Sequence, residues 1–234
     1  MRLRLGAPIL HTEGICGYCG EQRLDTQGYH AMCCALGEST RGHNRVRDSY
    51  GIFCGQADPS TAFEVQGLCP QDPSLRPADV LTGAVHPTSV VAVDIGIKAP
   101  HAAGSGDSPL EEMRRDKFDK YEDHLADLER QGIVYEPAIF SCYGRWHPRA
   151  TQLLQHAAAR AARRTGHASG SILLRRWRRQ IAAEIWRRAA RMVHACLPRG
   201  RDVDAEESAD GTRTEDVDLD DDPGGAEDTD APAN

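Results

Sequence analysis

The stretch RPADVL (76–81), followed after a turn-rich gap by VVAVDIGI (90–97), decides the fold. Each of these short apolar runs contains one aspartate, Asp79 or Asp94. Aspartate is depleted in strands, and burying its charge costs several kcal/mol unless the carboxylate is paired or bound to a metal. Two such aspartates, with 14 residues between them, predict a β-hairpin that brings two carboxylates to one metal ion.

A charged helix is predicted after this hairpin, at about 109–131. Met113, Lys117 and Tyr121 follow one another at i, i+4 spacing, which places Lys117 on or at the edge of the buried face. Lys120 lies one turn away on the flank. A lysine on a buried face needs a partner, and a strand carboxylate is the obvious one. The alternative is that both lysines lay their stems on the helix surface and keep their ammonium groups in water.

The segment before the hairpin has the spacing of a zinc site. Cys16 and Cys19 form a Cys-x2-Cys pair among glycines, and His30 and Cys34 are four residues apart, on one face of a helical turn. Cys33 is the alternative to Cys34 as the fourth ligand. Three thiolates and an imidazole complete a tetrahedral zinc shell, so the site would be structural and would supply much of the folding energy of this segment.

The rest of the chain predicts further elements. They are a basic helix at 39–53, strands at 63–68 and 133–141, and helices at 148–164 and 169–197. Glu64 is a candidate third acid or an ordinary surface residue, and Pro137 favours an edge position for its strand. The last helix carries seven arginines beside its apolar stripe, which either contact phosphates or are solvated: Arg175, Arg176, Arg178, Arg179, Arg187, Arg188 and Arg191.

The predicted order after the zinc segment is helix, three strands, helix, strand and two helices. This order describes a three-layered α/β (α+β) core. We therefore expect a linker and CCHC-type zinc knuckle at 1–38, the αβββαβ core at 39–166, a basic C-terminal helix at 167–200, and a disordered acidic tail at 201–234.

Charge is distributed unevenly along the chain. Residues 201–234 hold 14 of the 35 acidic residues but two of the 28 basic ones, which leaves a net charge of +5 on residues 1–200. A basic body suits a polyanionic partner, and the tail composition is typical of disorder. No apolar run approaches the roughly 18 residues that span a bilayer, and no signal peptide is evident. We expect an intracellular protein with reduced cysteines and no membrane partner.

The order of these motifs resembles the C-terminal module of non-LTR retrotransposon polyproteins of protist and algal type. In that module a zinc knuckle precedes a restriction-like endonuclease of the P-D-(D/E)-x-K superfamily. The resemblance covers about residues 4–197 and includes RGHN at 41–44 and CYGR at 142–145. It implies a restriction-endonuclease-like αβββαβ core and a phosphodiester hydrolase activity.

The resemblance also implies roles for individual residues. Asp79 and Asp94 match the two acids that hold Mg²⁺ or Mn²⁺. No lysine stands two residues after Asp94, and Lys117 matches a lysine that has moved onto the helix. Lys120 and Tyr121 match residues beside it, and all five are candidate catalytic residues.

The family nicks genomic DNA, and the freed 3′ end primes reverse transcription of the element's RNA. The resemblance therefore implies DNA as the substrate, the element's RNA as a further partner, and a nuclear location. Arg41, His43 and Asn44 match a basic motif linked to DNA handling, which Arg45 and Arg47 extend. The chain has no Tyr-x-Asp-Asp motif, so we expect no reverse transcriptase domain in it. The alternatives are a catalytically inactive zinc-containing nucleic-acid-binding module and a zinc-stabilised interaction protein.

Overall fold

A computed structural model describes residues 8–101, 106–166 and 169–198, which belong to one compact unit. The segment 201–234, predicted to be a disordered tail, lies outside the described residues. The elements in chain order are β1 (Gly14–Ile15), β2 (Arg23–Leu24), α1 (Ala31–Cys34), α2 (Leu36–Ala57), β3 (Ala62–Phe63), β4 (Val80–Thr82), β5 (Val90–Lys98), α3 (Pro109–Lys120), α4 (Glu122–Arg130), β6 (Ile133–Ser141), α5 (Pro148–Thr165) and α6 (Gly170–Cys196). Among the helices of the described residues, none has the length and apolar character that a membrane span requires.

The central feature is a four-stranded mixed sheet in the order β3-β4-β5-β6. The predicted hairpin is confirmed, because β4 and β5 pair antiparallel with Val80 opposite Val93. Strand β6 runs parallel to β5, with Asp94 opposite Pro137, and lies at the edge of the sheet as its proline predicted. The α/β class and the predicted order of helices and strands are therefore present in the structure, with two helices, α3 and α4, in place of the one predicted before β6.

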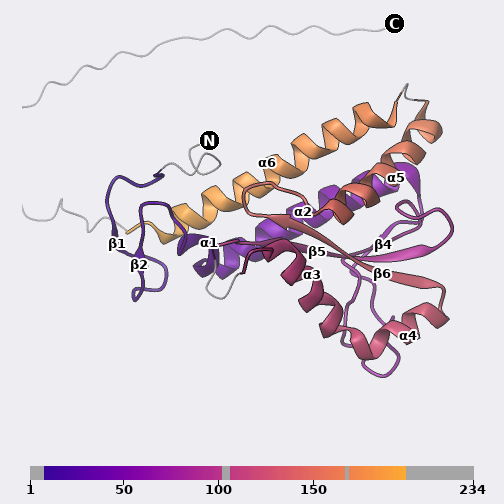
Figure 1. Cartoon of the computed structure of the whole chain (residues 1–234), viewed down its shortest axis with the longest axis horizontal. Coiled ribbons are helices and arrows are strands. Elements are labelled where there is room, and N and C mark those ends of the chain that lie inside the picture. The colour runs from indigo at the N-terminus through magenta and orange to yellow at the C-terminus, as the bar shows by residue number, and fades with distance from the viewer. Residues whose placement is uncertain (1–7, 102–105, 167–168, 199–234) are drawn as a thin grey trace, which may run out of the picture. The chain divides into compact units, whose positions relative to one another are not determined.

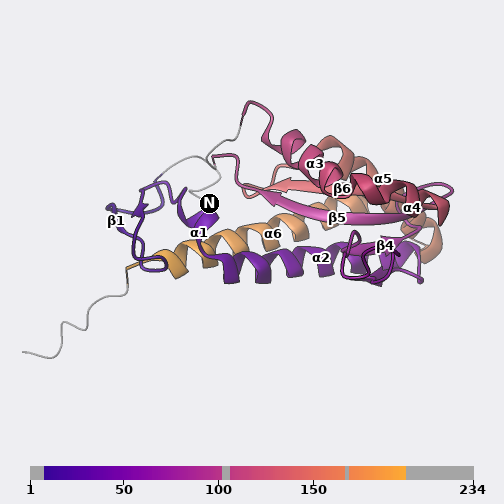
Figure 2. The ribbon, with the colours of Figure 1, turned by 90° about the horizontal axis from the view of Figure 1, so that it is seen from below.

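Helices cover both faces of this sheet, which gives the three predicted layers. Alternate residues of β5, including Val93 and Ile95, pack with α2, α5 and α6 in the largest apolar core. Ala92 lies on the other face and packs with Leu128 of α4 and Tyr135 of β6. Figure 2 shows β5 and β6 between α3 on one side and α2 with α6 on the other, and α6 lies along α2 in Figure 1.

Two predicted elements differ from the structure. The helix predicted at 109–131 is broken at Tyr121, whose side chain is buried and donates a hydrogen bond to the Arg76 carbonyl (3.1 Å). This anchor holds the backbone in a turn, so that α3 and α4 are separate helices. The strand predicted at 63–68 ends at Phe63, because Glu64 adopts a φ of 47° that a strand cannot contain.

One arginine of α6 is part of the packing between helices, and neither of the two roles predicted for the arginines describes it. Arg188 is 5% exposed, and its guanidinium donates to the Ser39 hydroxyl (2.6 Å) and carbonyl (3.3 Å) at the start of α2. A Cβ at Gly42 would lie 2.3 Å from the Arg188 Cγ. The glycine inside the RGHN motif therefore leaves room for the stem of this arginine.

Candidate metal centre and zinc site

The two aspartates of the hairpin lie side by side. Asp79 directly precedes β4, and the pairing of Val80 with Val93 places it beside Asp94 in the middle of β5. One carboxylate oxygen of Asp79, Oδ2, accepts a hydrogen bond from the Ile95 N–H (2.7 Å). The backbone of β5 thus fixes one acid while β5 itself carries the other.

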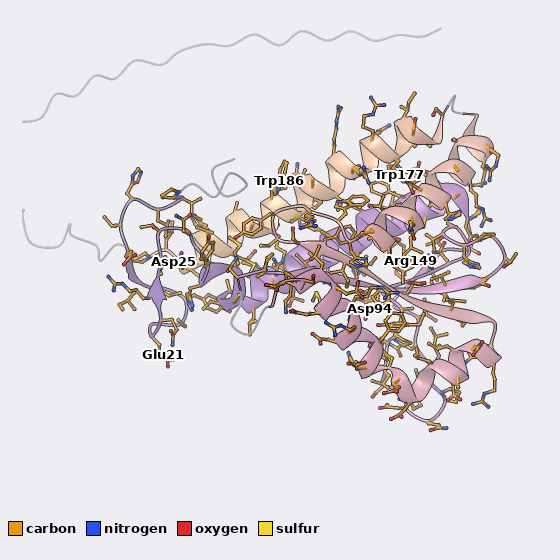
Figure 3. All side chains as sticks on the ribbon, viewed as in Figure 1. Glu21, Asp25, Asp94, Arg149, Trp177 and Trp186 are labelled. Carbon is orange, nitrogen blue, oxygen red and sulfur yellow. The ribbon has the colours of Figure 1, made fainter. Side chains whose placement is uncertain are left out.

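Lys117 of α3 reaches the same place from above the sheet. Its Nζ donates to Oδ1 of Asp94 at 2.5 Å, and its side chain is 19% exposed. The other oxygen of Asp94, Oδ2, accepts from the hydroxyl of Tyr135 on β6 at 2.7 Å. The prediction that this lysine pairs with a strand carboxylate is confirmed. Figure 3 labels Asp94 beside α3, the helix that carries Lys117.

Gly96 explains how a lysine on a helix can reach the hairpin. A Cβ at this position would lie 2.9 Å from the Lys117 Cε, 2.7 Å from the Ile139 Cδ1 and 3.0 Å from the Met113 Sδ. Real Cβ atoms rarely make contacts this short. The aliphatic stem of Lys117 can therefore lie against the sheet at residue 96 only because this residue is a glycine.

A methyl group added at Gly96 should therefore displace Lys117. We expect Gly96→Ala to lower any metal-dependent nicking at least about tenfold and to cost about 1–3 kcal/mol of stability through overpacking. Gly55→Ala is the matched control, because a Cβ at this α2 position meets nothing within 4 Å. The control should keep its nicking rate and melt at the same or a higher temperature. Equal nicking by Gly96→Ala and the parent would contradict this role of Gly96.

The environment pushes the pKa values of the two carboxyl groups in opposite directions. Burial raises the pKa of Asp94, despite the neighbouring Lys117, and the charge of Asp79 acts in the same direction. Burial also acts to raise the pKa of Asp79, but the hydrogen bond and charge of His43, the Ile95 N–H and the charge of Lys117 outweigh it and lower this pKa. Like charges held together in this way are typical of functional sites.

The other candidate catalytic residues have different positions. His43 of α2 lies beside Asp79, with its Nε2 3.4 Å from both carboxylate oxygens. The ring of Tyr121 packs against Tyr135 at 5.2 Å between centroids. Because its hydroxyl also bonds the Arg76 carbonyl, Tyr121 holds the loop before Asp79 in place. Lys120 is exposed, and its Nζ lies 4.8 Å from the centroid of the Tyr121 ring.

Glu64 and Arg47 are paired outside the carboxylate pair. The Glu64 carboxylate forms an ion pair with Arg47 and lies 3.6 Å from the Arg76 guanidinium. Arg47 also bonds Asp48 at 2.8 Å. The surface alternative for Glu64 therefore agrees with the structure. His43 and Arg47, four residues apart on one face of α2, both turn toward acids of the sheet region, whereas we predicted that they bind nucleic acid.

The predicted zinc ligands come together near the N-terminus. The ligand atoms of Cys16, Cys19, His30 and Cys34 all lie within 4.8 Å of one another, and this group could hold a metal ion. Cys33 is exposed and is not part of the group. Of the two alternatives for the fourth ligand, the geometry selects Cys34.

The backbone around this group favours a thiolate at Cys19 and fixes the turn that carries His30, whereas burial and the neighbouring thiols raise the pKa of Cys34 to about 12. Backbone N–H groups of Gln22 and Glu21 lower the pKa of the Cys19 thiol to about 6, which favours the thiolate that metals bind. The carboxylate of Asp25 accepts the N–H groups of Tyr29 (3.1 Å) and His30 (3.0 Å) and thereby orients the turn that carries the imidazole.

The end of helix α6 packs against the segment that carries the four candidate metal ligands. The sequence did not predict this contact. Cys196, near the end of α6, is buried in one apolar cluster with Cys16. The Cys196 carbonyl accepts the Gly17 N–H at 2.9 Å, and a Cβ at Gly17 would lie 2.3 Å from the Leu197 carbonyl oxygen. Nothing in the spacing of Cys196, 162 residues after Cys34, could have indicated this contact.

Part of the predicted nucleic-acid motif lies in a basic groove between α2 and α6. The groove has a volume of about 760 Å³. Its lining residues are Glu38, Arg41, Asn44, Arg45, Ala190, Arg191, His194 and Ala195. Arg41 bonds Glu38 at 2.5 Å, so Arg45 and Arg191 are the cations of the groove without an ion pair among the residues that the structure describes.

In comparisons with models of protein families, with curated proteins and with solved structures, nothing matches this chain significantly. The residues themselves must therefore carry any statement about function. Two carboxylates with a lysine between strand and helix can hold a hard divalent cation and stabilise negative charge beside it. Three thiols and an imidazole suit a softer cation such as Zn²⁺.

Proposed function

We propose that this chain is a metal-dependent DNA endonuclease that nicks duplex DNA, with the restriction-endonuclease-like core of a non-LTR retrotransposon module. One observation carries the proposal. Asp79, Asp94 and Lys117, singled out from three separate sequence segments, lie together, with a 2.5 Å bond between lysine and carboxylate. A purely structural ion pair needs one acid, whereas this site holds a buried acid, Asp94, beside a partly buried one, Asp79.

Each residue of this site has a role in phosphodiester hydrolysis. Asp79 and Asp94 would hold Mg²⁺ or Mn²⁺ through their oxygens. When bound, the cation polarises the phosphate and lowers the pKa of a water molecule. Lys117 offsets the charge that builds on the phosphate oxygens. His43 positions Asp79, and Tyr135 positions Asp94 through the hydrogen bond that its hydroxyl donates to the carboxylate.

The same proposal includes a structural Zn²⁺ on Cys16, Cys19, His30 and Cys34, four ligands that leave no open position for substrate. DNA is then the substrate, the RNA of the element is a second partner, and the nucleus is the place of action. In such a module a nick supplies the 3′ hydroxyl that primes reverse transcription by a separate polymerase domain.

A labelled duplex tests the reaction type. The full chain, incubated with a fluorescent 60-base-pair duplex and Mg²⁺ or Mn²⁺, should produce strand breaks that EDTA prevents. In the proposed reaction a water molecule attacks the phosphorus and the bond to the 3′ oxygen breaks, so each break should carry a 5′ phosphate and a 3′ hydroxyl that a DNA polymerase extends. Breaks that cannot be extended, or that form equally in EDTA, would rule out this chemistry.

The second candidate is a catalytically inactive nucleic-acid-binding module, which the basic groove between α2 and α6 favours because it contains neither Asp79 nor Asp94. Binding in this groove is electrostatic. In EDTA, we expect Arg45→Gln with Arg191→Gln to weaken duplex binding and to reduce the salt slope by about two, since each phosphate contact contributes about 0.9.

The matched control is Arg163→Gln, an exposed arginine of α5 outside the groove. It should leave the salt slope within about one of the parent value. Salt-sensitive binding without any metal-dependent breaks would establish the second candidate and exclude the first. An unchanged slope in the Arg45 and Arg191 variant would show that the groove does not bind DNA.

A further inference from the structure

A basic surface extends along α6, beyond the groove that this helix forms with α2. A hollow of about 490 Å³ lies on α6 itself, and four of its lining residues are arginines. They are Arg175, Arg176, Arg179 and Arg187. The groove begins one turn later on the same helix, at Ala190 and Arg191. The hollow and the groove are thus neighbouring parts of one surface, and we call the two together the α6 surface.

The helical period keeps these arginines on one side of α6. Arg176, Arg187 and Arg191 are 11 and four residues apart, close to whole numbers of helical turns. Ile181 and Ile185, which lie between them in the sequence, are fully buried and point into the core. At about 1.5 Å per residue, the row from Arg176 to Arg191 is about 22 Å long. The cations therefore form a row along a single rigid element.

The acids of the α6 surface are already paired. They are Glu38 in the groove and Glu184 in the hollow. Glu38 accepts a hydrogen bond from Arg41, and Glu184 accepts one from Arg187, each at 2.5 Å. The described part of the chain offers no acidic partner to the remaining cations, which are Arg45, Arg175, Arg176, Arg179 and Arg191. The surface therefore has an excess of five positive charges.

Packing does not explain the arginines of the hollow. Arg188 of the same helix is buried against Ser39, and its role is structural. Arg175, Arg176 and Arg179 are exposed, and among the described residues their side chains have no hydrogen bond or ion pair. Arg175 and Arg179 stand four residues apart, a spacing at which like charges weaken a helix. These charges oppose the formation of α6, so they need a reason other than folding.

We propose that the α6 surface binds the phosphate backbone of duplex DNA, and that the hollow and the groove contact the same duplex. Duplex DNA carries one negative charge per about 1.7 Å of its axis, so a row of about 22 Å faces about 13 phosphates. A single strand has a lower charge density and loses conformational freedom when it is straightened along a helix. A row of fixed cations therefore suits the stiffer and more highly charged duplex.

The α6 surface lies apart from the carboxylate site. Val93 and Ile95 of β5 pack in the core with α6, whereas Asp94 between them bonds Lys117 of α3. Figure 2 shows α3 and α6 on opposite sides of the sheet. DNA on the α6 surface would therefore anchor the chain without touching the carboxylates. The choice of DNA as the polyanion rests on the proposed function, whereas the surface is defined by its own charges.

Fluorescence anisotropy of a labelled 24-base-pair DNA duplex tests the proposal in EDTA, where metal-dependent cleavage does not occur. The salt dependence of the affinity is measured for the full chain and for Arg176→Gln with Arg179→Gln. Each phosphate contact contributes about 0.9 to the salt slope, so the double variant should lower it by about two. Between about 50 and 200 mM salt, the parent should lose about 12-fold more affinity than this variant. Adding Arg45→Gln and Arg191→Gln should lower the slope by about two more.

The charge-matched control is Arg23→Gln with Arg115→Gln, which removes an arginine already paired with Glu13 (2.7 Å) and an exposed one on α3. It should keep the slope of the parent. An equal loss of slope in the control, or an unchanged slope in the Arg176 and Arg179 variant, would overturn the proposal. Tighter binding of dT24 or of poly-glutamate than of the duplex would also overturn it. Absence of nicking by the parent, with these slope changes intact, would reject the endonuclease alone.

Discussion

Lys117→Met is expected to reduce metal-dependent nicking at least about 100-fold and to destabilise the fold by about 3 kcal/mol. Methionine keeps an unbranched stem that fits over Gly96, so the substitution removes the charge and little of the packing. Without the ammonium group, the buried carboxylate of Asp94 and the partly buried carboxylate of Asp79 remain side by side with no lysine to offset them. For a chain of this size the loss corresponds to a fall of about 6–12 °C in melting temperature.

A double variant separates the electrostatic cause from simple misfolding. Asp94→Asn combined with Lys117→Met removes the buried charge together with its partner, and the side-chain carbonyl of the introduced asparagine can still accept the Tyr135 hydroxyl. The double variant should regain at least half of the lost stability and no activity. Arg115→Met, an exposed neighbour on α3, is the control and should match the parent in both measurements. A double variant less stable than Lys117→Met would contradict the pairing.

Of the changes considered, removal of a cation from the group of Cys16, Cys19, His30 and Cys34 is expected to lower the stability of the protein most. Binding of structural Zn²⁺ supplies on the order of 10 kcal/mol in zinc-finger peptides, more than the few apolar residues of this segment can replace. We expect one zinc per chain by elemental analysis. We also expect a chelator, or Cys19→Ser, to abolish hydrogen-exchange protection at residues 14–35. This range includes Gly17, whose N–H bonds the end of α6.

Cys33→Ser is the matched control, since Cys33 adjoins a ligand but is exposed and outside the group. It should retain one zinc and the exchange protection of the parent. Loss of zinc from Cys33→Ser with retention in Cys34→Ser would show that the fourth ligand is wrongly assigned. Unchanged protection after complete chelation would show that no metal stabilises this segment.

Local patterns predicted the order of the elements. The β-branched run of β5, the alanines of α5 and the apolar stripe of α6 each indicate one type of structure over most of their length, and the structure confirms them. The break between α3 and α4 was not predictable, because it follows from a hydrogen bond between Tyr121 and a carbonyl 45 residues away. Short-range pattern contains no information on such contacts.

In the candidate site, too, the sequence predicted some residues but not those that depend on long-range contacts. The acids and Lys117 were identified because charged residues in apolar runs are costly and need a reason. Tyr135 was missed, because only the parallel register of β5 and β6 brings its hydroxyl to Asp94. Gly42 lies inside the RGHN motif and Gly96 stands two residues after Asp94, and a Cβ at either position would lie less than 3 Å from a long side chain, Arg188 or Lys117.

The most direct test is the nicking of supercoiled plasmid by the full chain in Mg²⁺, measured beside the Asp94→Asn variant and an EDTA control. If Asp79, Asp94 and Lys117 form a metal-dependent nuclease site, the parent converts supercoiled plasmid to the open circular form in Mg²⁺ only. The variant, folded as shown by its melting temperature, does so at least about 100-fold more slowly. Plasmid left intact by the parent in Mg²⁺ and Mn²⁺, or nicked equally by Asp94→Asn, would contradict the endonuclease assignment.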